Sequence, residues 1–126
     1  MKSKILAIYK KEEEIKKITD KIKNYSFSDL SKSRHFEFSV LEKATDESLL
    51  RETFPKFKLI QSIEFRENKK GEKYYGFNYE LEDGTFVVFV LTLDKIPPMI
   101  INAYYKNRNY KRFEKSLRKN YGNKFI

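Results

Sequence analysis

The only histidine of this 126-residue chain, His35, lies in the run Ser33-Arg34-His35-Phe36, beside a cation. Histidine is the side chain whose unperturbed pKa lies near neutral pH, so it can donate or accept a proton there. On a helix, His35 would share a polar face with Ser39 and Glu42, which lie one and two turns further along. A lone histidine is more often an ordinary surface or packing residue, and His35 is therefore a candidate acid or base to be weighed against that alternative.

The sequence lacks the residues that several other kinds of chemistry require. The chain has no cysteine and one histidine, which excludes thiol catalysis, disulfide scaffolds and the usual zinc centres. We find no glycine-rich phosphate loop, no nucleophile elbow and no spaced carboxylate cluster for Mg²⁺, so we predict neither a metal nor another cofactor. The remaining inventory suits RNA cleavage, because RNA supplies its own nucleophile, the 2′-hydroxyl, and needs only a base, an acid and cations.

Aromatic and basic residues alternate near the C-terminus, between Tyr104 and Phe113. Of the total net charge of +9, residues 102–126 carry +7, with Glu114 as their single acid. A local excess of this size suits a polyanion, because cations that neutralise phosphates release condensed counterions. Unpaired RNA bases also stack on aromatic rings and arginine planes. A solvated basic helix is the alternative interpretation.

This segment supplies most of the residues that we expect to bind nucleic acid. To its cations and one tyrosine we add the cation beside the histidine. The set is Arg34, Tyr105, Lys106, Arg108, Lys111, Arg112, Lys115, Arg118 and Lys119. Tyr110 and Phe113 are expected to face the core instead and to anchor the last helix.

Hydrophobic periodicity and chain breakers predict the elements that position these residues. Ile8, Ile15 and Ile22 repeat every seven residues, which predicts a helix over residues 3–24, either a packing arm or a dimer seam. A serine-rich break precedes a second helix over about 32–44. Thr45-Asp46 should cap a short third helix, which Pro55 ends.

The second half of the chain alternates apolar and polar residues, as strands do. We expect strands near 57–65, 74–81, 86–93 and 99–105, with a two-residue hairpin turn at Asp83-Gly84. A basic helix over 109–120 should close the chain, with Gly122 as its C-cap. The prediction is one α+β domain, 1–126, with N-terminal helices (an arm over 1–24), a core over 31–105 that ends in a four-stranded antiparallel meander sheet, and a basic C-terminal helix within 106–126.

The order of these features resembles a known family. Ser33-x-His35-Phe36 at a helix start is followed about ten residues later by a Thr-Asp-Glu cap, and the meander ends in an apolar strand and a tyrosine. This is similar to the BrnT-like members of the RelE superfamily of toxins, in the barnase–EndoU–colicin–RelE group, over about residues 31–105. The resemblance implies a metal-independent endoribonuclease that acts on free or ribosome-associated RNA and is often neutralised by an antitoxin protein. His35 matches the family's first-helix histidine, and Lys43 stands near the place of a family arginine.

The candidate catalytic set combines a proton-transfer group, two cations and a phenol: His35, Lys43, Arg51 and Tyr104. Two alternatives to an enzyme stay open. The first is a non-catalytic RNA- or DNA-binding module that uses the basic C-terminal helix. The second is a protein-binding role, in which residues 3–24 form a homodimer seam or an antitoxin dock.

The apolar segments of the chain are short. The N-terminal apolar run, Ile5 to Tyr9, is too short for a signal peptide, and the longest run, Phe86 to Leu93, is far below the roughly 20 residues that span a bilayer. We therefore expect no membrane partner and a cytoplasmic location.

Overall fold

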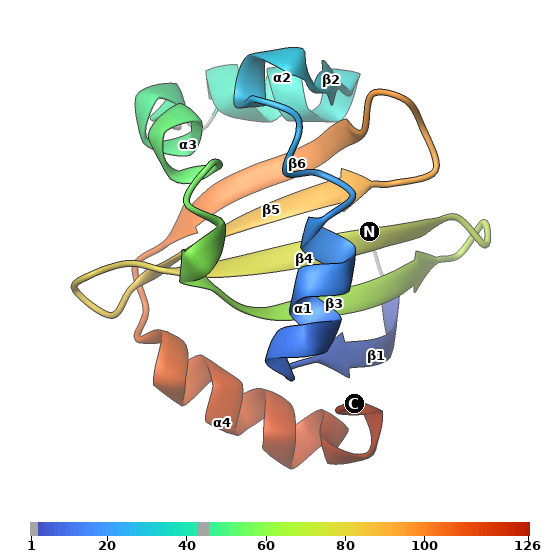
Figure 1. Ribbon diagram of the computed structural model, residues 1–126, viewed down its shortest axis with the longest axis vertical. Coiled ribbons are helices and arrows are strands. Elements are labelled where there is room, and N and C mark those ends of the chain that lie inside the picture. The colour runs from blue at the N-terminus through green and yellow to red at the C-terminus, as the bar shows by residue number, and fades with distance from the viewer. Residues whose placement is uncertain (1–2, 43–45) are drawn as a thin grey trace.

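The computed structural model describes residues 3–42 and 46–126, so Lys43 lies outside the described residues. The strands are β1 (Ser3–Tyr9), β2 (Ser31–Lys32), β3 (Ile60–Asn68), β4 (Lys73–Glu80), β5 (Phe86–Thr92) and β6 (Met99–Lys106). The helices are α1 (Glu12–Thr19), α2 (Arg34–Glu42), α3 (Glu47–Thr53) and α4 (Tyr110–Tyr121). Helices α1, α2 and α3 come between strands along the chain, and α4 follows the last strand (Figure 1).

One mixed sheet of six strands has the order β1-β3-β4-β5-β6-β2. Strands β3 to β6 form the antiparallel meander that the sequence predicts. Strand β1 adds antiparallel to the outer edge of β3, and the two residues of β2 pair in parallel with Met99 and Ile100 of β6. The prediction of N-terminal helices followed by a four-stranded antiparallel meander is therefore wrong, because the sheet has two more strands and the helices are interspersed with them.

The predicted helix over residues 3–24 is wrong in its first half. Residues Ser3–Tyr9 form β1, whose Ile8 lies opposite Glu64 of β3, and a helix begins only at Glu12. A seven-residue spacing of isoleucines fits a strand followed by a helix as well as one long helix. Because Ile8, Ile18 and Ile22 are buried within their own chain, they do not form a helical seam for a homodimer.

The first two hairpins of the meander have three-residue loops that end in glycine. Residues 69–71 lie between Asn68 and Glu72, whose backbones are hydrogen-bonded, and residues 82–84 lie between Leu81 and Thr85, which are bonded in the same way. Gly71 has φ 81° and Gly84 has φ 88°, in the left-handed region that other residues rarely adopt. The loop predicted as the two residues Asp83-Gly84 is thus one residue longer. A type I turn followed by a left-handed glycine is the common form of a three-residue hairpin loop.

Side chains cap the three later helices. The Ser33 hydroxyl accepts from the Phe36 N–H at the start of α2, and the Asp46 carboxylate accepts from the Leu49 N–H at the start of α3, as the sequence predicts. The Asn109 side chain accepts from the Arg112 N–H at the start of α4. Gly122 is not a left-handed C-cap, because its φ is −53° and the chain continues into a 3-10 turn.

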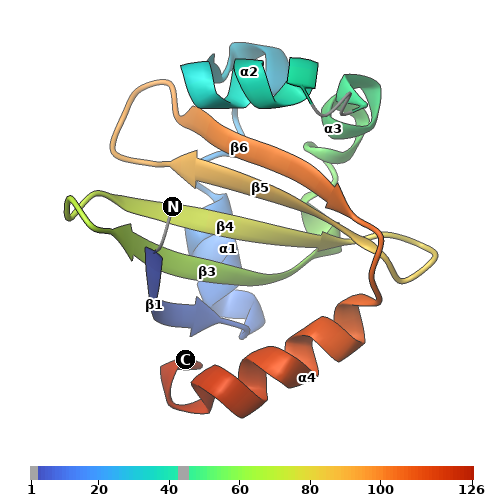
Figure 2. The ribbon, with the colours of Figure 1, turned by 180° about the vertical axis from the view of Figure 1, so that it is seen from behind.

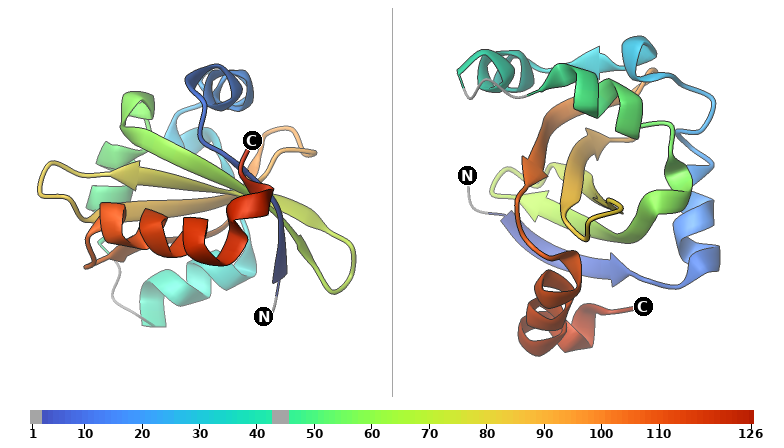
Figure 3. Two further views of the ribbon diagram at one scale, coloured as in Figure 1. Left: turned by 90° about the horizontal axis from the view of Figure 1, so that it is seen from below. Right: turned by 90° about the vertical axis from the view of Figure 1, so that its left-hand side faces the viewer.

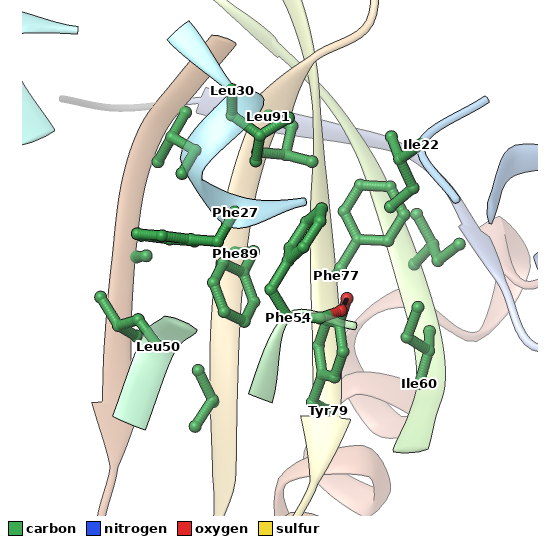
Figure 4. Packing of buried hydrophobic residues seen from close by; sticks show 14 of the residues in the cluster. Ile22, Phe27, Leu30, Leu50, Phe54, Ile60, Phe77, Tyr79, Phe89 and Leu91 are labelled. Carbon is green, nitrogen blue, oxygen red and sulfur yellow. Dashed lines mark hydrogen bonds between the residues drawn. The ribbon is translucent and has the colours of Figure 1, made fainter. Parts of the chain in front are cut away.

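The main core lies between one face of the sheet and the layer formed by α1, α2 and α3. The rings of Phe27, Phe54 and Phe89 meet edge to face at its centre (Figure 4). The Tyr79 hydroxyl donates to the Phe54 carbonyl at 2.8 Å, so this buried phenol has its partner. The opposite face of the sheet has α4 at one end, where Tyr110 and Phe113 pack against Phe86.

Figure 3 (right) looks almost along the strands and separates the two sides of the sheet. In this view, α1 lies on one side of the sheet. Helix α4 lies below β1, at the edge of the curved sheet. Figure 2 views the molecule from behind, with α1 on the far side of the strands and no helix in front of β4 and β5. We call this side the open face.

Candidate nucleic-acid interface

The open face is mainly polar along β3 and β4. Side chains alternate along a strand, so every second residue points to this face. The register places Glu64 opposite Gly76, Arg66 opposite Tyr74, and Ser62 opposite Asn78. Their neighbours Ile63 and Phe77 pack in the main core on the other side. The pairing of β3 with β4 therefore brings the polar side chains of both strands onto the same face of the sheet.

Glu64 and Arg66 form an ion pair on this face. The Arg66 Nε donates to Glu64 Oε1 at 2.9 Å, and Nη2 donates to the same oxygen. The Arg66 Nη1 donates to the Ser3 hydroxyl of β1 at 3.1 Å. The Glu64 side chain is 5% exposed and the Arg66 side chain 29%. Glu64 is thus shielded from solvent, and it orients a guanidinium that remains accessible.

A chain of hydrogen bonds continues from Glu64 to α4. The Asn78 Nδ2 donates to Glu64 Oε2 and to the Ser62 hydroxyl, both at 3.0 Å. The Ser62 and Tyr110 hydroxyls lie 2.6 Å apart, and Tyr110 donates to Glu114 Oε1 at 3.0 Å. Because Tyr110 has one proton and a carboxylate can only accept, Ser62 must donate to Tyr110. From Asn78 onward each donor therefore points toward the helix, and Asn78 also donates in the other direction, to Glu64.

Glu114 is the last group in this series of hydrogen bonds, and it attaches α4 to Lys10, the residue that follows β1. Its Oε1 lies 2.8 Å from Lys10 Nζ, and its Oε2 lies 3.4 Å from Arg118 Nε. Burial acts to raise the pKa of Glu114, but the hydrogen bond and the charge of Lys10, with further hydrogen bonds from Tyr110 and Arg118, lower the pKa below its usual value. Glu114 is therefore ionised at neutral pH.

Tyr104 of β6 lies on the same face of the sheet as the Glu64–Arg66 pair. Burial raises the pKa of its phenol, the Glu64 carboxylate raises it further and Arg66 lowers it, so the phenol lies within electrostatic range of both groups. Tyr74 is on this face as well, directly opposite Arg66 in the register. Gly76 lies between Glu64 and Val90 in the register, and as a glycine it places no side chain between these two residues. We call Glu64, Arg66, Tyr74 and Tyr104 the open-face cluster.

The outer side of α4 carries a row of exposed cations next to the open face. Lys111, Arg112, Lys115 and Lys119 are exposed and have no carboxylate partner among the side chains that the structure describes. Tyr110, Phe113 and Leu117 face the sheet, as the periodicity of the helix predicts. We call these four cations the α4 row.

The other residues predicted to bind nucleic acid have mixed positions. Arg108 is exposed between β6 and α4, and Lys106 Nζ lies 5.2 Å from the centre of the Tyr104 ring on the open-face side. Arg118 pairs with Glu114 and is 4.4 Å from the Phe125 ring, so it serves α4 itself. Tyr105 lies opposite Val87 of the main core and thus points away from the open face.

The residues predicted for catalysis do not form one site. His35 and Arg34 are exposed on α2, and His35 makes no hydrogen bond or ion pair with the side chains that are described. Arg51 donates to the Ser28 hydroxyl at 2.6 Å and lies over the Phe27 ring, in the helical layer. Tyr104 belongs to the open face on the other side of the sheet.

Sequence reasoning missed Ser62, Glu64, Arg66 and Asn78. Their signal is the polar half of the alternation in residues 62–66 and 74–78, where serine, glutamate, arginine, tyrosine and asparagine share one face. Alternation alone identifies a polar face. Only the pairing of β3 with β4 shows that the two polar halves are the same face and that Asn78 reaches Glu64.

No family model matches this chain, and no curated protein or solved structure matches it either. The resemblance to RelE-type toxins therefore stays a prediction. Residues 3–42 and 46–126 contain no group of three or more histidine, aspartate or glutamate side chains arranged to hold a metal ion. In the same residues, no helix is long and apolar enough to cross a membrane.

Proposed function

We propose that this protein binds single-stranded RNA across the open face and along α4, as a cytoplasmic binding module. The observation that carries this proposal is that α4, whose outer side carries the α4 row, packs beside Tyr104 on the open face. Arg66, Tyr74 and Tyr104 offer partly exposed planar groups on the sheet, and the cations lie along its border. Single-stranded nucleic acid is bound by this combination, because bases stack on planar groups while cations contact the phosphates.

The charge of α4 is available for a ligand. The single acid of the helix, Glu114, is engaged by Lys10, Tyr110 and Arg118, so it does not neutralise the α4 row. If the four cations of the row each contact one phosphate, the logarithm of the association constant should fall with the logarithm of salt concentration with a slope of about −3. Hydrophobic or neutral ligands would show no such slope.

The test is the binding of a short labelled single-stranded RNA as a function of salt concentration. Replacing Lys111, Arg112 and Lys115 by glutamate should weaken binding by more than about tenfold and reduce the salt slope by about 2. The matched control replaces Lys11, Lys16 and Lys58 by glutamate, three exposed lysines outside α4. An equal loss in the two variants would show that net charge alone attracts RNA and would overturn the proposed surface.

RNA cleavage is a second candidate function, favoured by the open-face cluster. Arg66 is oriented by Glu64 and lies opposite Tyr74, and the same face carries the Tyr104 phenol, so this face offers a cation and two potential proton donors. In the predicted reaction, the 2′-oxygen bonds to phosphorus and the bond from phosphorus to the 5′-oxygen breaks. A base takes the proton of the 2′-hydroxyl, and an acid gives a proton to the leaving 5′-oxygen. Both oxygens of Glu64 are occupied, so the base would have to come from elsewhere.

Cleavage is tested with labelled RNA in excess EDTA, comparing wild type with His35→Ala and Tyr104→Phe. Cleavage that Tyr104→Phe abolishes and His35→Ala leaves intact would assign the chemistry to the open-face cluster. Cleavage lost only in His35→Ala would assign it to α2. Binding without product at any protein concentration would leave the binding module as the function.

The family resemblance adds two partners to the cleavage candidate, the ribosome and an antitoxin protein. Cleavage that occurs only when the RNA is bound to ribosomes would support the first. A protein that copurifies with the chain and inhibits its cleavage would support the second. If no cleavage is found, both partners lose their basis, since neither is required by a binding module.

A further inference from the structure

A hollow of about 480 Å³ lies on the side of the sheet opposite the open face. Three separate parts of the chain line it: the turn after α1, the hairpin of β3 and β4, and the start of the loop between β5 and β6. Its volume falls within the range of about 300–1,000 Å³ that is usual for small organic ligands. This hollow has no part in the proposed binding of RNA.

An aromatic wall forms one side of the hollow. Phe65 and Tyr75 lie directly opposite each other on β3 and β4, with ring centres 4.8 Å apart and ring planes inclined by 32°. Tyr75 packs against the main core, which fixes the wall on the α1 side of the sheet, and both residues remain partly exposed. Two adjacent rings of this kind offer a surface for a flat aromatic group.

Three lysines from different segments converge on the same hollow. Lys21, Lys73 and Lys95 line it, and the ion pairs of the described residues include none of them. The hollow also contains Glu72, which accepts from the Asn68 amide at 2.9 Å, and Asp94. Three cations and two carboxylates leave a small positive excess, which suits an anion of low charge.

We propose that this hollow binds a nucleoside monophosphate, with the base on the Phe65–Tyr75 wall and the phosphate at Lys21, Lys73 and Lys95. The ligand must combine a flat aromatic group with an anion, because the lining offers both features within one small volume. Such a nucleotide can be free in solution or can be the 5′-phosphorylated end of an RNA. Because the sheet separates the hollow from the open face, occupancy of one site should leave affinity at the other unchanged.

The test is calorimetric titration of the full chain with adenosine monophosphate, adenosine and inorganic phosphate. Adenosine monophosphate should bind with a stoichiometry of one and about tenfold more tightly than phosphate, because the base adds stacking. Phe65→Leu, which keeps an apolar side chain without a ring, should reduce its affinity to that of phosphate. Equal affinity for phosphate and for the nucleotide in wild type would overturn the proposal, as would the absence of saturable nucleotide binding.

Lysine variants test the site further without disturbing the fold. Replacing Lys73 and Lys95 by alanine should weaken nucleotide binding by about tenfold. The control replaces Lys69 and Lys70, exposed lysines of the same hairpin that do not line the hollow, and should bind as wild type does. An equal loss in both double variants would mean that the nucleotide responds to overall charge and would contradict the assigned site.

The two sources of the ligand are separated in the variant with Lys111, Arg112 and Lys115 replaced by glutamate, which should lack RNA binding at the open face. Two RNAs of identical sequence, with and without a 5′-phosphate, are compared. Selective binding of the phosphorylated RNA would show that the hollow takes RNA ends. Binding of the free nucleotide alone would assign it to free nucleotides. This nucleotide titration succeeds or fails independently of the salt-dependent binding of RNA in the wild type.

Discussion

The hydroxyl groups of Ser62 and Tyr110 lie 2.6 Å apart, and this contact connects the polar row of β3 to the last helix. The two residues are 48 positions apart in the sequence. On one side of the contact, Asn78 joins Ser62 to the Glu64–Arg66 pair, and on the other side Tyr110 donates to Glu114. The helix that carries the α4 row is thus attached to the open-face cluster through hydrogen-bonded side chains.

Tyr110→Phe should destabilise the fold by about 1–3 kcal/mol, the usual effect of leaving a buried polar group without its partner. The phenylalanine ring still fills the space beside Phe86 and Phe113, so the loss reports the hydroxyl alone. The measurement is urea denaturation. Tyr121→Phe, at an exposed tyrosine of the same helix, is the control and should unfold like wild type. Equal stability of Tyr110→Phe and wild type would show that the chain of hydrogen bonds contributes nothing.

Glu64→Gln should cost about 2–3 kcal/mol of unfolding free energy, because it leaves Arg66 without its carboxylate in a partly buried position. Glu67→Gln removes a comparable charge from the same strand, where Glu67 lies 3.7 Å from the highly exposed Lys4. A pair with so exposed a lysine contributes at most about 1 kcal/mol. The two midpoints in urea, measured side by side, should therefore differ clearly, and similar midpoints would refute the structural role of Glu64.

Acid should weaken the attachment of α4 through Glu114. The pKa of this carboxyl is lower in the folded protein than its ordinary value of 4.5. The stability that it contributes is therefore complete above pH 4.5 and is lost as the pH falls through the lower folded pKa. Melting temperatures of wild type and Glu114→Gln, measured from neutral pH downward, should converge in this acidic range. Curves that stay parallel would contradict the assignment.

Two glycines next to α4 should respond to alanine in opposite directions. At Gly84, with φ 88°, an added Cβ would lie 3.2 Å from Asn109 Nδ2, so Gly84→Ala should cost about 1–2 kcal/mol. At Gly122, φ is −53° and nothing lies within 4 Å of an added Cβ. Gly122→Ala should therefore stabilise the protein by up to about 1 kcal/mol, because alanine favours the helical conformation. Thermal unfolding of both variants checks the two signs.

Local sequence signals predicted the elements that depend on local interactions. Asp46 and Pro55 indicate the limits of α3, and Asp83-Gly84 marks the loop between β4 and β5. Caps and turns act over a few residues, so their energy can be read from neighbouring positions. The basic outer face and apolar inner face of α4 were predictable for the same reason, because a helix places residues three and four apart on one side.

The first strand was not predictable from its own residues. Ile5 and Ile8 fit an apolar stripe on a helix as well as a run in a strand, and the pairing with β3, nearly 60 positions away, decides between them. The same holds for the candidate site. His35 was a candidate because it is the single histidine, although it lies alone on α2. Glu64 and Arg66 are two of many charged residues until the sheet places them on the same face as Tyr104.

The sequence by itself determined the α+β class, the meander of β3 to β6, the positions of α2, α3 and α4, and the excess of cations at the C-terminus. These features follow from periodicity, capping and composition, which are properties of adjacent residues. The tertiary structure alone decided that β1 and β2 complete the sheet, that polar residues of β3, β4 and β6 share the open face, and that α4 lies next to it. Strand register is a long-range choice, because the free energy of pairing depends on which distant partner buries the apolar face.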